Sequence, residues 1–171
     1  IGDTNAGKSG NTGSLDEIRK LMLSSYQAGN YVDAAAGARE IIKSQPNNKL
    51  AWKVLASALH SVGDMPNAVE AGERAVALAP KDAQAFQNLG NVYLDLKRQS
   101  EAKACFEKAC VIRPRWPEAA GNLGIANMGL GLWDEAEQCF IRAISIDDRF
   151  CQAHYNLASL MQKNGRYAEA K

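Results

Sequence analysis

The chain has 171 residues, of which 46% are hydrophobic, and its 20 basic and 19 acidic residues leave a formal net charge of +1. This balance gives no electrostatic reason to expect binding to nucleic acid or to an anionic membrane surface. The sequence has no apolar run of 18 residues, so we expect no membrane-spanning segment. Its four cysteines are dispersed through a chain large enough to fold without disulfides, and we therefore expect a reducing, cytoplasmic setting.

The first segment, residues 1–14, is predicted to be a flexible tail or a cloning remnant. Gly2–Ser9 fits the phosphate-binding pattern G-x-x-x-x-G-K-S, but such a loop needs a preceding strand and only Ile1 stands before it. Asn11–Gly13 is typical of a linker, so we expect no nucleotide binding. The capping-box pattern at Ser14–Glu17 predicts that the first helix begins there. Because the chain starts with Ile rather than Met, we expect a fragment or a processed protein.

A 34-residue period organises the rest of the chain and is typical of a helix–turn–helix solenoid. Apolar residues within each period follow helical spacing, which predicts two helices with facing apolar stripes. Two residues recur without exception, a leucine in the first helix and a small alanine in the second. They are Leu21, Leu55, Leu89, Leu123 and Leu157, and Ala34, Ala68, Ala102, Ala136 and Ala170.

The predicted helices can be placed in chain order from these patterns and from their stop signals. Glycine suits a left-handed helix end, and proline cannot continue a helix. Glycines stand at 29, 63, 131 and 165, with Lys97 in their place once, and prolines at 46, 80 and 114, with Asp148 in their place once. We expect the first helix of each pair at 15–28, 49–61, 83–96, 117–130 and 151–164, and the second at 32–44, 66–79, 99–112 and 133–146.

This pattern resembles the tetratricopeptide repeat family. The third unit is most similar, with Phe86-x-x-Leu89-Gly90-x-x-Tyr93 followed by Ala102-x-x-x-Phe106 and Pro114. The resemblance implies an all-α fold, a right-handed α-solenoid of antiparallel helix pairs whose inner surface is lined mainly by the first helices. We expect four full repeats at 15–48, 49–82, 83–116 and 117–150, and a truncated fifth at 151–171.

The truncated fifth unit leaves two interpretations open. Leu157, Leu160 and Met161 would lack part of their cover, because a solenoid needs a polar cap on its last repeat. Either further repeats or another domain follow residue 171, or the chain self-associates through this bare end.

No set of residues predicts catalysis or a resident cofactor. Cys105 and Cys110 share one predicted helix instead of a loop knuckle, so we expect packing residues and no zinc. His154 occupies the place of Trp52 and Phe86 in earlier units, so it is also expected to pack. We therefore predict a protein that is not an enzyme and binds no metal.

The remaining indication of function is a row of three asparagines, each 34 residues from the next, which we call the asparagine ladder: Asn88, Asn122 and Asn156. An amide side chain both donates and accepts hydrogen bonds, so such a row suits the backbone of an extended peptide. The alternative is that these amides bond within the solenoid or to water. The ladder is similar to that in the tetratricopeptide region of O-linked N-acetylglucosamine transferases, which implies a groove on the first helices. The expected peptide-binding residues are Lys53, Gln87, Asn88, Asn91, Asn122, Tyr155 and Asn156.

Two functions stay open at this point. The first is a scaffold that binds a protein or an extended peptide, and the second is the substrate-recruiting arm of a larger enzyme whose catalytic domain is absent here. The carboxylate-clamp subfamily, which holds chaperone tails, is disfavoured because Glu118 stands where that clamp needs a cation and would repel a carboxylate.

Overall fold

The computed structural model describes residues 12–163, and this part of the chain forms nine helices and no strand. The chain divides into two compact units, one up to Leu78 and one from Ala79. The first unit contains α1 (Thr12–Gln27), α2 (Tyr31–Ser44), α3 (Lys49–Val62) and α4 (Met65–Leu78). The second contains α5 (Ala83–Asp95), α6 (Gln99–Ile112), α7 (Pro117–Gly129), α8 (Trp133–Ile146) and α9 (Cys151–Lys163).

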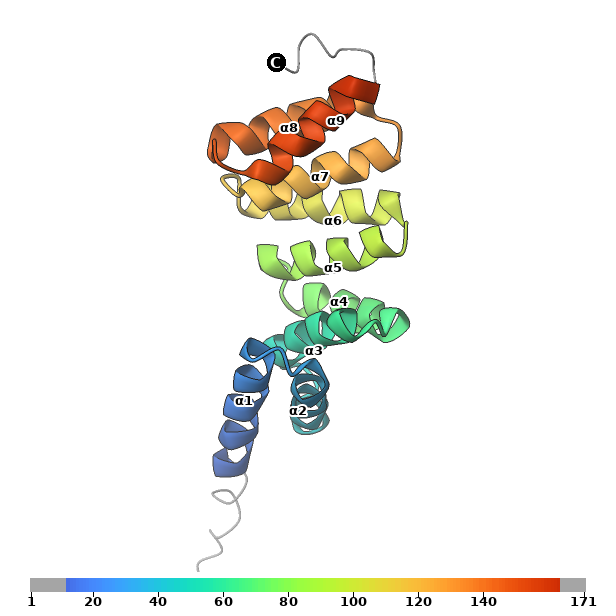
Figure 1. Cartoon of the computed structure of the whole chain (residues 1–171). Coiled ribbons are helices and arrows are strands. Elements are labelled where there is room, and N and C mark those ends of the chain that lie inside the picture. Colours follow the sequence, from blue (N-terminus) through green and yellow to red (C-terminus); the bar gives the residue numbers. More distant parts are fainter. Residues whose placement is uncertain (1–11, 164–171) are drawn as a thin grey trace, which may run out of the picture. The chain divides into compact units, whose positions relative to one another are not determined.

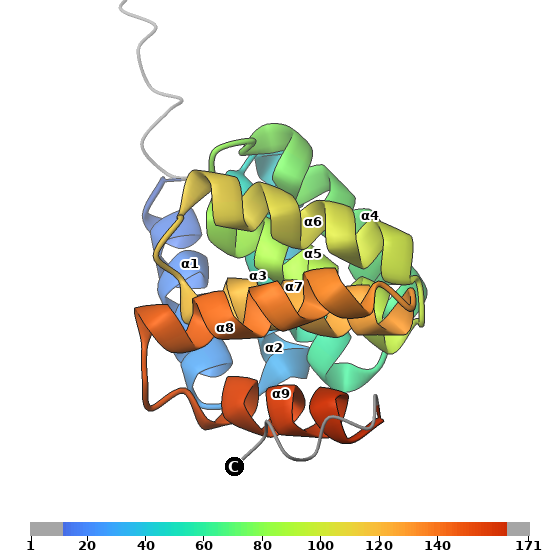
Figure 2. The ribbon, with the colours of Figure 1, turned by 90° about the horizontal axis from the view of Figure 1, so that it is seen from above.

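Each unit is built from antiparallel helix pairs. In the first unit α1 packs on α2 and α3 on α4, while in the second α5 packs on α6 and α7 on α8 (Figure 1). The last described helix, α9, packs on both α7 and α8 at the edge of the second unit (Figure 2). The predicted all-α solenoid of helix pairs is confirmed. The repeat boundaries proposed from the sequence stay a prediction.

The helix ends agree with the sequence signals, with one correction. Helix α1 begins at Thr12, so Ser14 lies inside the helix and the predicted capping box does not start it. The expected tail therefore overlaps the helix, and the phosphate-loop pattern at 2–9 lies outside the described residues. Two N-caps do bind as capping side chains should: Asn48 Oδ1 accepts from the Ala51 amide, and Asp82 Oδ1 accepts from the Gln84 amide.

The turn inside each helix pair has a left-handed residue. Gly29, Gly63 and Gly131 have φ of +78°, +84° and +74°, as the glycine signal predicted. Lys97 holds the same turn in the third pair with φ +60°, a conformation that costs a residue with a Cβ free energy. The backbone geometry of this turn is therefore kept even where the sequence does not suit it.

Lys97→Gly is expected to raise the free energy of unfolding by about 1 kcal/mol, because glycine reaches positive φ without the steric cost. Urea unfolding followed by circular dichroism measures this. Lys97→Ala is the matched control, since it removes the same side chain but keeps the Cβ. An equal gain from the alanine variant would show that the lysine side chain, and not its φ, is unfavourable.

The two helices of a pair approach closely through complementary large and small residues. In the second unit Phe106 and Phe140 are fully buried, and each ring lies against a glycine of the facing helix, Gly90 or Gly124. A Cβ at Gly124 would come within 2.5 Å of the Phe140 ring. In the first unit the large residue is instead Met22 of α1, which lies against Gly37 of α2. The small residue of the crossing thus lies on the first helix of the third and fourth pairs and on the second helix of the first pair.

Two of the turns between helix pairs are closed by ring nitrogens, which the sequence analysis did not foresee. Trp52 Nε1 donates to the Pro46 carbonyl at 2.7 Å, and His154 Nε2 lies 2.8 Å from the Asp148 carbonyl. These pairs have equivalent places in the second and fifth units. His154 is exposed and its ring bonds the turn, so the expectation that it packs is wrong.

Candidate functional site

The asparagine ladder lies on one surface of the second unit, which we call the A-helix face and define as the exposed side of α5, α7 and α9. Helix α7 contacts both α5 and α9, whereas α5 and α9 do not contact each other. Asn88, Asn122 and Asn156 stand on them one after another, and each is half-buried. The 34-residue spacing gives the three asparagines equivalent places on α5, α7 and α9, and their role as a binding site stays a prediction.

One hydrogen bond connects two of the predicted site residues across helices. Asn122 Nδ2 of α7 donates to Asn91 Oδ1 of α5 at 2.9 Å, over a separation of 31 residues. This bond fixes the orientation of both amides and uses one of the two Nδ2 hydrogens of Asn122. Asn91 and Asn122 therefore bond within the solenoid, as the alternative interpretation expected. The second Nδ2 hydrogen of Asn122 is not used by this bond.

The other two asparagines are oriented from within their own helices. Gln84 Nε2 donates to Asn88 Oδ1 at 2.9 Å, and Gln152 Nε2 donates to Asn156 Oδ1 at 3.2 Å. A spacing of four residues lets side chains on one helix face meet in this way. Nδ2 of Asn156 is buried and has no hydrogen-bond partner among the described residues. A buried donor that is left without a partner in this way costs free energy.

The other predicted residues lie in different surroundings. Tyr155 is 72% exposed on α9, beside Asn156 in sequence. Gln87 is only 5% exposed, and its Oε1 has no partner among the described residues, so this amide is not on the accessible surface. Lys53 is half-buried on α3 and belongs to the first unit, so the structure does not bring it to the A-helix face.

Cys105, Cys110 and Cys139 show the features of packing residues, whereas Cys151 is exposed. Cys105 and Cys110 are buried, and burial raises the pKa of the Cys110 and Cys139 thiols. Asn127, itself buried, donates through Nδ2 to Cys139 Sγ at 3.6 Å. Because the thiolate is the reactive and metal-binding form, a raised pKa disfavours both roles at neutral pH. Within residues 12–163 no group of three or more His, Cys, Asp and Glu side chains is placed to hold a metal ion.

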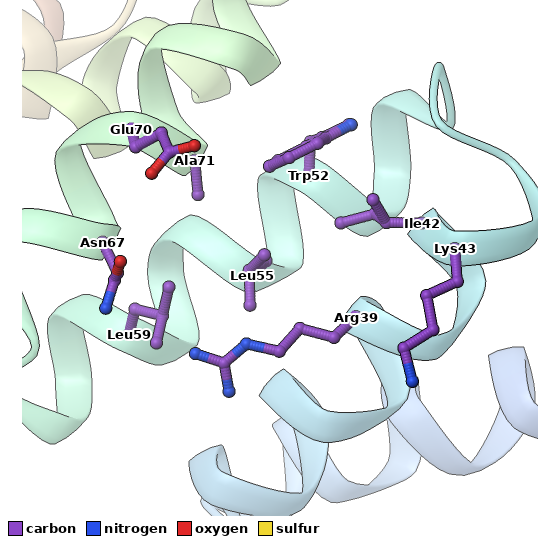
Figure 3. A pocket seen from close by; sticks show the side chains of 9 residues that line it. All are labelled: Arg39, Ile42, Lys43, Trp52, Leu55, Leu59, Asn67, Glu70 and Ala71. Carbon is purple, nitrogen blue, oxygen red and sulfur yellow. The ribbon is translucent and has the colours of Figure 1, made fainter.

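A cavity of about 340 Å³ in the first unit was missed by the sequence analysis. It lies between α2, α3 and α4, over an apolar floor that includes Trp52, Leu55 and Leu59 (Figure 3). One sign of this cavity was present in the sequence. Helix α4 carries the small Ala71 at the place where α6 and α8 carry the larger Cys105 and Cys139.

Comparison with known proteins identifies the class to which this fold belongs. Three models of the tetratricopeptide repeat family match residues 20–83, 83–115 and 139–171, which together are most of the chain. The chain is therefore a tetratricopeptide repeat protein. No curated protein is significantly similar to it in sequence. None of the helices within the described part is both long and apolar enough to cross a membrane.

Solved structures of MamA share this fold. A crystal structure of MamA has a TM-score of 0.82 at 21% identity, and the match covers 88% of this chain and 88% of that chain. MamA 41-end from Desulfovibrio magneticus RS-1 has a TM-score of 0.85 at 20% identity and covers 91% and 88%. MamA MSR-1 has a TM-score of 0.80 at 23% identity and covers 92% and 90%. At such identities the likeness shows the fold alone.

Proposed function

We propose that this protein is an interaction scaffold whose A-helix face binds an extended segment of a protein partner. The observation that carries the proposal is the row of oriented amides formed by Asn88, Asn122 and Asn156, with Asn91 bonded to the middle one. Both a free-standing scaffold and the recruiting arm of a larger enzyme would use such a face.

The amides suit a peptide backbone because each carries donors and acceptors. Packed helices lie about 8–10 Å apart, and an extended chain rises about 3.3 Å per residue. Neighbouring asparagines would therefore meet the ligand backbone about every third residue. A backbone reader of this kind has little sequence preference, and the exposed ring of Tyr155 adds a surface for one apolar side chain of the peptide.

The triple variant Asn88→Ala, Asn122→Ala, Asn156→Ala is expected to bind extended peptides more weakly, by about 0.5–1.5 kcal/mol for each lost hydrogen bond. The measurement is retention of a random-sequence library of unstructured peptides, compared between the wild type and the variant. Peptides of increasing length provide a second readout, because only those that reach all three amides should bind with full affinity.

Two controls separate binding from folding. The variant Ser100→Ala, Lys108→Ala, Gln138→Ala changes three exposed side chains on α6 and α8 and should retain wild-type binding. The double variant Asn88→Ala, Asn156→Ala keeps the Asn91–Asn122 bond, so it tests the ladder without loosening α5 from α7. Equal retention by the wild type and a folded triple variant would refute the proposed role of the asparagines.

A further inference from the structure

The cavity of the first unit has the form of a receptor for one protein side chain. Trp52, Leu55 and Leu59 of α3 make its floor, and α2 and α4 make its walls (Figure 3). Leu55 and Leu59 are 5% and 3% exposed, so the floor belongs to the folded core and its position is fixed. A volume of about 340 Å³ is at the lower end of the range of ligand pockets, too small for a helix but adequate for a large side chain with part of its backbone.

The walls carry opposite charges that have no partner among residues 12–163. Arg39 of α2 extends its guanidinium over the apolar floor towards Leu59, and Glu70 stands on α4 across the cavity (Figure 3). Neither forms a hydrogen bond or an ion pair with a described residue. Lys43, also on α2, differs because its amine is already paired with Glu40 at 2.9 Å. Arg39 is therefore the cation of this cavity that is available to a ligand.

These charges are not a requirement of the repeat. The equivalent places in the layer formed by α6, α7 and α8 hold Glu107 in place of Arg39 and Gln138 in place of Glu70. The equivalent of Ala71 there is Cys139, a larger side chain. The charge pair of the first unit is thus not repeated in that layer, as expected of a binding site and not of a packing pattern.

We propose that this cavity binds a segment of a partner protein that inserts one large apolar side chain beside an acidic residue. The apolar side chain would lie on Leu55 and Leu59 against Trp52. The neighbouring carboxylate would pair with the Arg39 guanidinium, whose planar set of donors matches a carboxylate. Glu70 would accept a backbone N–H of the segment and disfavour a second acidic residue on its own side. The site is separate from the A-helix face, so either proposal stands without the other.

The test uses the capped peptide Gly-Ser-Glu-Leu-Glu-Ser-Gly and two matched probes, one with Lys in place of both Glu and one with Ser in place of Leu. Binding is followed by nuclear magnetic resonance through the indole N–H signals. Trp52 lines the cavity, while Trp116 and Trp133 lie in the second unit and serve as internal references. We expect the acidic leucine peptide to shift the Trp52 signal selectively, and both altered probes to bind about tenfold more weakly or not at all.

Arg39→Glu is expected to weaken binding of the acidic peptide about tenfold and to improve binding of the basic one. Arg39 is exposed, so this change should leave the fold intact. Lys20→Glu is the matched control: it makes the same charge change on an exposed residue of α1 that does not line the cavity. No shift of Trp52 with the acidic peptide, or an equal response of Arg39→Glu and Lys20→Glu, would overturn the proposal. Ala71→Leu, which fills the cavity, should abolish the shift in a protein that is still folded.

Discussion

Replacement of Phe140 by alanine is expected to lower the free energy of unfolding by about 3–5 kcal/mol. The ring is fully buried in a cluster with Ala136 and Leu160, and Ile125, Met128 and Leu157 pack against that cluster. Its loss removes apolar contacts and leaves a cavity that rigid neighbouring helices fill only in part. Urea unfolding followed by circular dichroism gives the difference from the wild type.

The next residue along α8 is the matched control. Ile141 is 43% exposed, so Ile141→Ala removes an apolar side chain from the same helix without opening the core. We expect its effect to stay within about 0.5 kcal/mol, as for most surface substitutions. Similar losses for the two variants would contradict the buried position of Phe140.

Gly124→Ala is expected to destabilise the second unit by about 1–3 kcal/mol, although alanine is the better helix former. The added Cβ would stand 2.5 Å from the Phe140 ring, which is enclosed and cannot withdraw. The combination with Phe140→Leu should be less destabilising than the sum of the two single changes, because the smaller side chain makes room for the Cβ. A double-mutant cycle measures this coupling.

A second glycine of α7, Gly129, provides a control, because a Cβ added there would lie as close to its nearest atom as a Cβ at Gly124. A Cβ at Gly129 would also approach an atom at 2.5 Å, but that atom is the amide carbon at the end of the flexible Gln99 side chain. Because this side chain can move aside, Gly129→Ala should be close to neutral or slightly stabilising. Equal costs at Gly124 and Gly129 would show that the phenylalanine ring is not the cause.

The periodic features of the fold followed from the sequence because they depend on residues close together in the chain. Left-handed turns at Gly29, Gly63 and Gly131 and helix ends shortly before Pro46, Pro80 and Pro114 each express a local backbone preference. The same geometry at Lys97 shows that the tertiary structure imposes the turn where the local preference is absent.

The site was predictable only as a row of residues. Helical period and repeat spacing place Asn88, Asn122 and Asn156 on one face, but they do not determine which amide bonds which neighbour. The Asn91–Asn122 bond and the burial of Gln87 depend on contacts between helices far apart in sequence. The cavity beside Arg39 was missed for the same reason, since three helices must be in place before it exists.

The large-and-small pairing at the helix crossings has a consequence for how such a chain can be recombined. In the first pair the bulky partner, Met22, belongs to the leading helix, whereas in the third and fourth pairs the bulky partner, Phe106 or Phe140, belongs to the trailing one. A chimera that joined α1 to α6 would bring Met22 and Phe106 to one crossing, and one that joined α5 to α2 would leave a void there. Gene breakpoints inside a hairpin should therefore be poorly tolerated when they join the first pair to the third or fourth, whereas a whole hairpin carries its own large and small partners with it.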